Sequence, residues 1–275
     1  MKIALYQAQT GIDPQRNAED LVRAVREAAD GGAAMLFTPE MSGLLDQKRE
    51  RARPHYRDEA SDPVLAAVRN AAAEAGIWVH LGSLALVGGG DGRLVNRGFV
   101  IDASGGIRAR YDKMHLFDVD LPTGESWRES ASYSAGEGPA TVDTPLGRLG
   151  LSICYDVRFP DLYRALTGAG ATILSVPAAF TVPTGQAHWH ILLRARAIEA
   201  GVFVVAAAQA GRHEDGRETF GHSLVVDPWG KVLLDMGAEP GLGFADIDPA
   251  RVDEVRSRLP AIRHRREIGE PALMR

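Results

Sequence analysis

The chain has 275 residues, of which 45% are hydrophobic and 24% charged, and its formal net charge is −5 at pH 7. This composition is typical of a soluble globular protein, and the acidic balance disfavours nucleic acid, whose phosphates need a concentrated positive field. A single cysteine excludes an intrachain disulfide framework and a cysteine-rich zinc site, so we expect the reducing cytoplasm.

Membrane and export segments are not expected in this sequence. Residues 1–7 carry one basic side chain and run directly into a strand pattern, without the apolar stretch and cleavage site of a signal peptide. No window reaches the apolar length that spans a bilayer. We therefore expect a protein with no membrane partner.

The first part of the chain predicts alternating strands and helices. Residues 2–8 and 33–37 are predicted as strands, and apolar residues at helical spacing predict helices over 17–30 and 63–75. The run 33–37 is entirely apolar, as is typical of a strand covered on both faces, and it leads to Glu40.

A glycine cluster at 88–92 lies between two further predicted strands, 77–87 and 93–102. We interpret it as a hairpin turn, because no helix follows it and the glycine spacings of nucleotide-binding loops are absent. Residues 107–111 are predicted as the next strand, and Lys113 follows directly. A long polar stretch, 118–138, then predicts a binding loop that contains Glu129.

The second half of the chain also alternates strands with helices. The predicted strands are 140–144, 148–153, 171–176, 202–208, 220–227, 231–235 and 241–248, and the predicted helices are 161–168, 186–200 and 249–258. These elements predict one α/β domain over residues 1–275, with a mixed sheet system and helices on its outer faces. The arginine-rich segment 256–267 is interpreted as an extended tail that packs on a neighbour or is solvated.

Cys154 lies at the end of the apolar run 149–153 and shortly before a predicted helix. Such a strand, turn and helix would expose the turn residue and direct helical N–H groups toward a bound group. The alternative is a buried cysteine acting as a small apolar residue. The neighbours Tyr155, Asp156 and Arg158 are too polar for an ordinary core position, which favours a functional thiol.

Glu40, Lys113 and Cys154 each follow a predicted strand. A thiolate that attacks an amide needs a base, an oxyanion donor and an acid for the leaving nitrogen, and these residue types supply them. Strand ends gathered on one sheet edge would bring the three together, but acids and lysines end many strands, so spacing alone leaves the grouping open.

Three segments, 38–40, 111–118 and 152–160, together resemble the signature segments of the nitrilase superfamily of carbon–nitrogen hydrolases, in the family's order. The similarity extends through 193–199 and 221–230, so it covers nearly the whole chain. The resemblance implies a four-layer αββα sandwich and homodimers that pair through helical faces. It implies no metal and no cofactor.

The resemblance also implies roles for individual residues. Glu40 would deprotonate Cys154, while Lys113 and the backbone N–H of Tyr155 would stabilise the oxyanion. Ammonia would then leave a thioester, which a water activated by Glu40 would hydrolyse. Glu129 matches a second glutamate of the family, with a supporting role in orienting substrate and holding Lys113.

Within the superfamily, segments 187–196, 206–213 and 259–266 are most similar to the branch that hydrolyses deaminated glutathione. The alternatives are ω-amidases, which act on 2-oxoglutaramate and 2-oxosuccinamate, and amidohydrolases of N-carbamoyl amino acids. The amide substrates of the first two branches are small anions. Three residues are therefore candidates to contact a carboxylate: Arg128, Arg212 and His213. Arg158 is expected to hold a local acid such as Asp156.

Other hypotheses remain beside this one. His115 and His222 suggest a Cys-His protease, but the sequence around Cys154 matches no such family. His188 and His190 are expected to be one surface and one packed histidine, not metal ligands. A non-catalytic binding protein that keeps the fold is disfavoured, because the glutamate, lysine and cysteine are all present.

Overall fold

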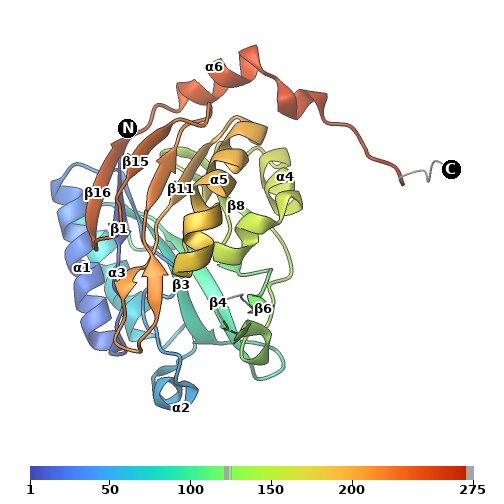
Figure 1. Ribbon diagram of the computed structural model, residues 1–275. Helices are drawn as coiled ribbons and strands as arrows, with labels where there is room; N and C mark the ends of the chain where they lie inside the picture. Colours follow the sequence, from blue (N-terminus) through green and yellow to red (C-terminus); the bar gives the residue numbers. More distant parts are fainter. Residues whose placement is uncertain (121–123, 125, 271–275) are drawn as a thin grey trace.

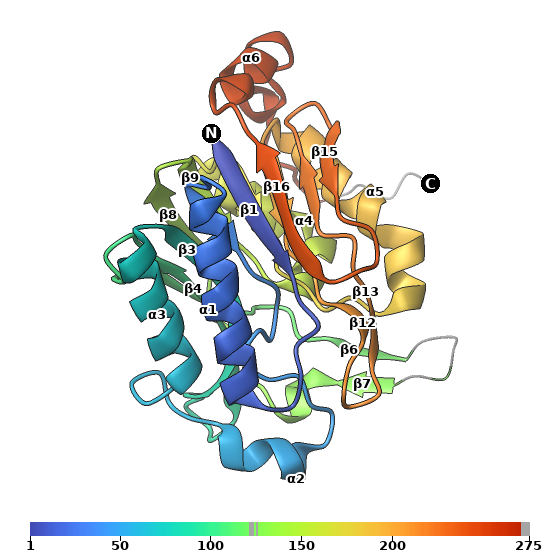
Figure 2. The ribbon, with the colours of Figure 1, turned by 90° about the vertical axis from the view of Figure 1, so that its left-hand side faces the viewer.

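The structure is a computed structural model that describes residues 1–120, 124 and 126–270. Its main strands form two six-stranded sheets, which stand face to face in Figures 1 and 2. The first sheet has the order β16 (Gly241–Asp246), β1 (Lys2–Gln7), β2 (Met35–Phe37), β3 (Trp78–Val87), β4 (Leu94–Ile101), β5 (Ile107–Asp112). The second has the order β15 (Val232–Asp235), β14 (Leu224–Val226), β11 (Phe203–Ala206), β10 (Ile173–Ser175), β9 (Gly147–Leu151), β8 (Ala140–Thr144).

Helices cover the outer face of each sheet. The α-helices are α1 (Pro14–Asp30), α2 (Arg49–Ala52), α3 (Pro63–Ala75), α4 (Pro160–Gly168), α5 (Val182–Ala200) and α6 (Ala250–Arg258). Short 3-10 helices are η1 (Arg53–His55), η2 (Glu129–Ala131), η3 (Cys154–Arg158) and η4 (Ala261–His264). Because α1 and α3 lie on the first sheet and α4 and α5 on the second, the expected αββα sandwich is confirmed (Figures 1 and 2).

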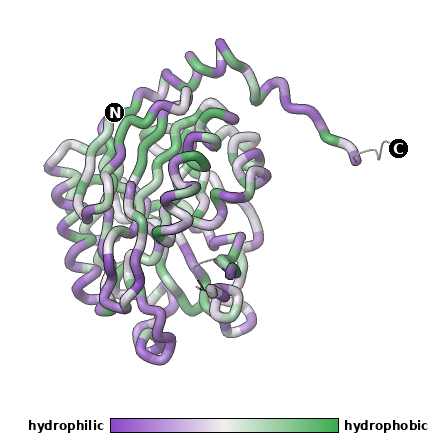
Figure 3. The backbone as a smooth tube through the Cα atoms, in the orientation of Figure 1, coloured by the Kyte–Doolittle hydropathy of each residue, from purple (hydrophilic) through white to green (hydrophobic). Residues whose placement is uncertain are grey.

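The alternation of side chains along each strand produces the two apolar layers. Ile3 and Leu5 on β1 belong to the core between the sheets, whereas Ala4 packs with the buried faces of α1 and α3. The same division occurs on β2, which is buried on both faces as its apolar run predicted. Figure 3 accordingly shows hydrophobic central strands and mostly hydrophilic residues on the outside of α1 and in α2.

Capping residues set the helix boundaries, and some lie away from the predicted ones. Helix α1 begins at Pro14, three residues before the predicted start, because the side chain of Asp13 accepts a hydrogen bond from Gln15 N at 2.9 Å. Helix α5 begins at Val182 instead of residue 186, since Pro183 is tolerated in a first helical turn. It ends where Gly201 takes a left-handed conformation (φ 56°).

Two hairpins were not predicted as such. The polar stretch 118–138 contains β6 (Asp118–Asp120) and β7 (Ser126–Arg128), and residues 121–123 and 125 lie outside the described part. The predicted strand 220–227 was wrong in extent, because Phe220 belongs to a separate hairpin of β12 (Ala210–Arg212) and β13 (Glu218–Phe220). The glycine cluster 88–92 does connect β3 to β4, which pair antiparallel as expected.

The arginine-rich segment after α6 is anchored on its own chain at its start. Arg265 donates to Thr167 Oγ1 at 3.0 Å and to Arg164 O at 3.2 Å, and Ile262 packs against the larger of the two apolar clusters. The expectation of a wholly solvated or neighbour-bound tail was therefore wrong for its first part. Beyond it the chain extends away from the sandwich (Figure 1).

The parallel strands of both sheets end on the same side of the molecule. β1, β2 and β3 are parallel, and so are β9, β10 and β11. A parallel bridge between Ala8 and Gln209 joins the two groups. Polar residues that follow these strands therefore meet at one edge of the sandwich, as the candidate site requires.

A glycine permits the close approach of segments at this edge. A Cβ atom at Gly82 would lie 2.1 Å from Thr38 O and 2.6 Å from Pro177 Cβ. Only glycine allows the segment after β2 and the segment after β10 to close over β3 here. Separately, no helix within the described ranges has the length and apolar character needed to cross a bilayer.

Candidate active site

Cys154 stands at a strained turn directly after β9. Its φ of 50° is left-handed, a conformation that is costly for a residue with a Cβ and recurs at nucleophile turns. The turn is held by two hydrogen bonds: Cys154 N donates to Pro177 O at 2.9 Å, and Ile153 N donates to Asp156 Oδ2 at 2.8 Å. The predicted strand, turn and helix are confirmed.

Asp156 stabilises this turn through its hydrogen bonds. It is fully buried and accepts hydrogen bonds from the Tyr111 hydroxyl at 2.7 Å and from His115 N at 3.0 Å. The expectation that Arg158 holds this acid was wrong. Arg158 instead lies 5.7 Å from the ring centroid of Phe180, because its side chain points from η3 toward the aromatic residues at the site.

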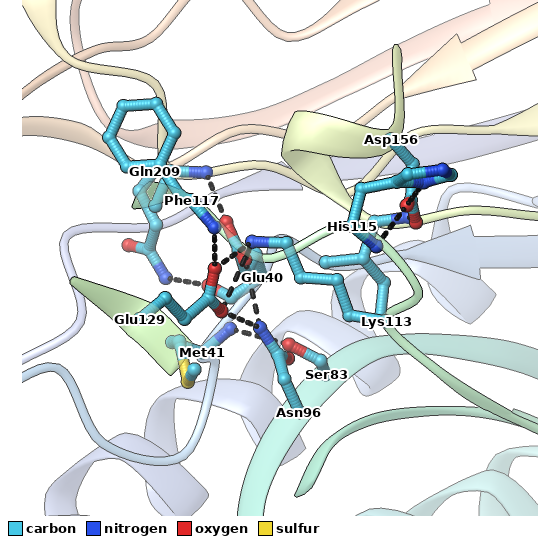
Figure 4. A network of polar contacts seen from close by, with 12 residues as sticks. Glu40, Met41, Ser83, Asn96, Lys113, His115, Phe117, Glu129, Asp156 and Gln209 are labelled. Atoms are coloured by element: carbon cyan, nitrogen blue, oxygen red, sulfur yellow. Dashed lines mark hydrogen bonds and ion pairs between the residues drawn. The ribbon is translucent and has the colours of Figure 1, made fainter. Parts of the chain in front are cut away.

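Two glutamates enclose Lys113, which follows β5. Lys113 Nζ donates to Glu40 Oε1 at 2.8 Å and to Glu129 Oε2 at 2.9 Å (Figure 4). Asn96 on β4 bonds both acids, with Nδ2 at 2.9 Å from Glu40 Oε1 and 3.2 Å from Glu129 Oε1. One buried cation therefore lies between two carboxylates, and a strand amide fixes their separation.

Backbone N–H groups also orient the two carboxylates. Ala179 N donates to Glu40 Oε2 at 3.0 Å, and Phe117 N donates to Glu129 Oε2 at 2.7 Å. The main chain of Glu40 is fixed as well, because Gln209 Nε2 donates to its carbonyl at 2.9 Å (Figure 4). The segments after four different strands, β2, β5, β10 and β11, are thus joined into one cluster.

The charges of this cluster set its protonation states. Burial alone would raise the pKa of Glu40, but the Lys113 charge and hydrogen bonds from Lys113, Cys154 and Asn96 lower it below its usual value. Burial raises the pKa of the Cys154 thiol, and the Glu40 charge raises it further, against the effect of Lys113. Glu40 is therefore an ionised base beside a neutral thiol at neutral pH.

These residues line a cavity of about 330 Å³, in the size range of pockets for small molecules. The wall contains Glu40, Lys113, Glu129 and Cys154 together. Cys154 is only 7% exposed, so its thiol is buried, as the alternative of an apolar cysteine predicted. Its exposed part, however, faces the cavity. The three sequence candidates are thus brought to one site.

Two of the four candidates for substrate contacts line the cavity and two do not. Tyr155 and Arg128 line the cavity, and Arg128 Nη2 already donates to Asp120 Oδ2 at 2.8 Å. Arg212 and His213 are not part of the cavity wall. His213 is buried, and its ring contacts the Thr10 carbonyl and the Thr219 hydroxyl, so its hydrogen bonds hold the β12–β13 hairpin.

Two residues at the site were missed from the sequence. Asn96 could have been noticed as a polar residue inside an otherwise mostly apolar strand. Arg217 lies in the β12–β13 loop and lines the cavity, although no local pattern distinguishes it from other loop arginines. Only the tertiary fold brings it beside the catalytic cluster.

The comparisons with known proteins agree with this geometry. The family model for carbon-nitrogen hydrolases matches residues 2–257. The chain belongs to the carbon-nitrogen hydrolase family. A relative from Yersinia enterocolitica, named deaminated glutathione amidase, is 39% identical over 97% of this chain and 93% of its own length. The expected nitrilase-type hydrolase is confirmed.

Two solved structures support the same assignment for this carbon-nitrogen hydrolase. The NitFhit protein of C. elegans has a TM-score of 0.89 at 39% identity, covering 96% of this chain and 65% of that protein. An amidase from Nesterenkonia sp. AN1, solved after Michael addition of acrylamide at its active-site cysteine, has a TM-score of 0.78. It is 30% identical and covers 94% of this chain and 98% of that one.

None of the histidines that the structure describes lines the cavity at Cys154. His115 is bonded to Asp156, and neither it nor His222 lines the cavity, so the Cys-His alternative gains no support. His188 is exposed, whereas His190 is half-buried and contacts Asp235, as His222 also does, at 2.9 and 2.8 Å. The side chains of His190, His222 and Asp235 could together hold a metal ion, and none of them belongs to the cavity wall.

Proposed function

We propose that this hydrolase cleaves the amide bond of a small anionic substrate, deaminated glutathione, to a carboxylate and the departing amine, cysteinylglycine; a primary carboxamide in the same site would release ammonia. The observation that carries the proposal is the enclosed cluster of Glu40, Lys113 and Glu129 around Cys154 in one small cavity. The name of the Yersinia enterocolitica relative supports the substrate, and so does that of a human relative, 40% identical over 98% of this chain.

The first half of the reaction forms a thioester. The ionised Glu40 takes the proton of the Cys154 thiol as the sulfur attacks the amide carbon. The oxyanion is stabilised by Lys113 and by the backbone N–H of Tyr155, at the start of η3. Glu40 then gives the proton to the nitrogen, the C–N bond breaks and the amine leaves, as cysteinylglycine from deaminated glutathione or as ammonia from a primary carboxamide.

The second half releases the acid. Glu40 takes a proton from a water that adds to the thioester carbon, and the same two donors stabilise the second oxyanion. The C–S bond then breaks and the thiolate regains its proton from Glu40. Glu129 acts through Lys113, which it positions by the 2.9 Å hydrogen bond. Lys113 stays charged because the charges of both glutamates raise its pKa, although burial lowers it.

The substrate is tested by measuring product release side by side, as cysteinylglycine from deaminated glutathione and as ammonia from 2-oxoglutaramate, an N-carbamoyl amino acid and a simple nitrile. We expect the highest kcat/KM on deaminated glutathione. A higher value on 2-oxoglutaramate or on the carbamoyl compound would assign the chain to one of those alternative activities. No product from any of them would favour the non-catalytic binding protein, although the complete cluster argues against it.

The assembly belongs to the proposal as well. We take residues 1–275 as one domain in a reducing cytoplasmic compartment, which the single thiol requires to stay reactive. Pairing into a homodimer is supported by exposed apolar side chains on one face of α5, where Ile191 is 71% and Ile198 44% exposed. Trp229, 58% exposed in the β14–β15 turn, extends this patch, since Arg194 Nε bonds Gly230 O.

Light scattering after gel filtration checks the dimer. We expect twice the 29.6 kDa mass of one chain, and the double variant Ile191→Glu, Ile198→Glu is expected to run as a monomer, because two charges would be buried in the interface. Val87→Glu, at an exposed apolar residue outside the patch, is the matched control and should stay dimeric. A monomeric wild-type chain would contradict the pairing.

A further inference from the structure

The cavity wall contains an arginine whose charge is incompletely matched by the residues that the structure describes. The side chain of Arg217 is only 18% exposed, and its Nε is buried without a hydrogen-bond partner among those residues. Its ion pair with Asp215 is long, at 3.7 Å from Nη2 to Oδ2. The carboxylate of Asp215 is instead bonded by Gln47 N and Arg217 N, both at 2.9 Å.

A second unused donor lies beside the first. The indole Nε1 of Trp127 is also buried with no partner in the described part of the chain. The Arg217 guanidinium lies 4.8 Å from the Trp127 ring centroid, and both residues line the cavity. Buried donors are rarely left unpaired in folded proteins, so two neighbouring ones indicate a place for an acceptor that arrives with a ligand.

Of the three other arginines of the wall, Arg49 is exposed to solvent and two are already engaged. Arg128 binds both carboxylate oxygens of Asp120, and Arg158 lies over the rings of Tyr155 and Phe180. Burial lowers the pKa of Arg217, which an arginine tolerates without losing its proton. An anion bound there would recover the free energy that desolvating this cation costs.

We propose that Arg217, together with the Trp127 indole N–H, binds a carboxylate of the substrate. The inference rests on the proposed amidase function and deepens it. The preferred class is then the ω-amides of dicarboxylic acids, in which a carboxylate and the reacting carboxamide stand at opposite ends of a short chain. The guanidinium fork fits a carboxylate with two N–H donors, and the ring of Trp127 holds it in place.

The test compares two amides that differ only at the far end. Glutaramate carries a carboxylate where pentanamide carries a methyl group. Arg217→Met should lower kcat/KM for glutaramate at least about 30-fold, the effect of leaving a buried charge without its partner. Its kcat/KM for pentanamide should stay within about threefold. Arg217→Lys should recover part of the loss, because it restores the charge but not the fork.

Controls separate this inference from the proposed function. Arg212→Met removes a charge from the same hairpin, at a residue outside the cavity wall, and should leave the preference for glutaramate unchanged. Calorimetry with the Cys154→Ala protein should show glutaramate binding that Arg217→Met weakens by a similar factor. Thermal unfolding of each variant checks that it is folded.

The outcomes are distinct. Ammonia release with equal losses on both amides, or with none, overturns the role of Arg217 and leaves the amidase function standing. Arg217-dependent binding without any ammonia release overturns the amidase function alone. Absence of both binding and turnover overturns the carboxylate site together with the function.

Discussion

Replacing Cys154 with alanine is expected to abolish ammonia release while the protein stays folded. The variant lacks the atom that forms the thioester, and losses on removing a nucleophile reach about 10⁴-fold or more. The fold should persist, because Cys154 N still donates to Pro177 O and the anchor Asp156 is untouched. Steady-state ammonia release and a thermal unfolding curve give the two readouts.

Because the chain has a single cysteine, thiol labelling is a specific control for this prediction. A thiol-specific alkylating reagent should add one label to the wild type, and none to Cys154→Ala. Labelling should remove activity in proportion to its extent. A Cys154→Ala protein that retains turnover, or a fully labelled wild type that stays active, would contradict the nucleophile assignment.

Glu40, Lys113 and Cys154 each follow a strand by at most three residues, but it was the resemblance of three segments to the nitrilase superfamily, and not this spacing, that identified them. Parallel strands deliver such residues to a common edge, so the grouping follows once the topology is known. Their contacts could not be predicted. The 2.8 Å bond between Lys113 and Glu40 depends on the pairing of four strands, β2 to β5, and on Gly82 letting two loops approach.

The hairpin at 210–220 shows why the rest of the site was missed. The sequence favoured Arg212 and His213, but the pairing of Arg212 with Glu218 turns the chain back and places Arg217 at the cavity. Local patterns cannot determine which arginine of a loop faces inward. Similarly, Phe220 was assigned to the following strand, although Gly221, with a φ of 72°, separates it from β14.

Strain and charge are concentrated at the same edge of the sandwich. Met41 and Cys154 both have positive φ values, of 56° and 50°, directly beside the buried charges. Such conformations persist only where the surrounding structure enforces them, as the bonds from Gln209, Ser83 and Asp156 do here. The site is therefore preorganised by the fold, and the ligand has little ordering to supply.

Replacing Lys113 with methionine is expected to lower kcat for amide hydrolysis by at least about a hundredfold, the scale for losing one oxyanion donor. The change also leaves Glu40 and Glu129 facing each other without the cation between them. Two close carboxylates raise one another's pKa, so one of them takes up a proton and Glu40 becomes a poorer base. Steady-state kinetics with ammonia detection measure the loss.

A loss of stability would confuse this result, because removing one partner of a buried ion pair costs about 3–5 kcal/mol. The double variant Lys113→Met, Glu129→Gln separates the two effects, since it restores the net charge of the cluster to the wild-type −1. We expect it to regain most of the stability in urea unfolding and to stay as inactive as the single variant. Glu129→Gln alone keeps Lys113 paired with Glu40 and should lose less activity. If the double variant regained activity along with stability, Lys113 would be a structural cation and the oxyanion would depend on the Tyr155 N–H.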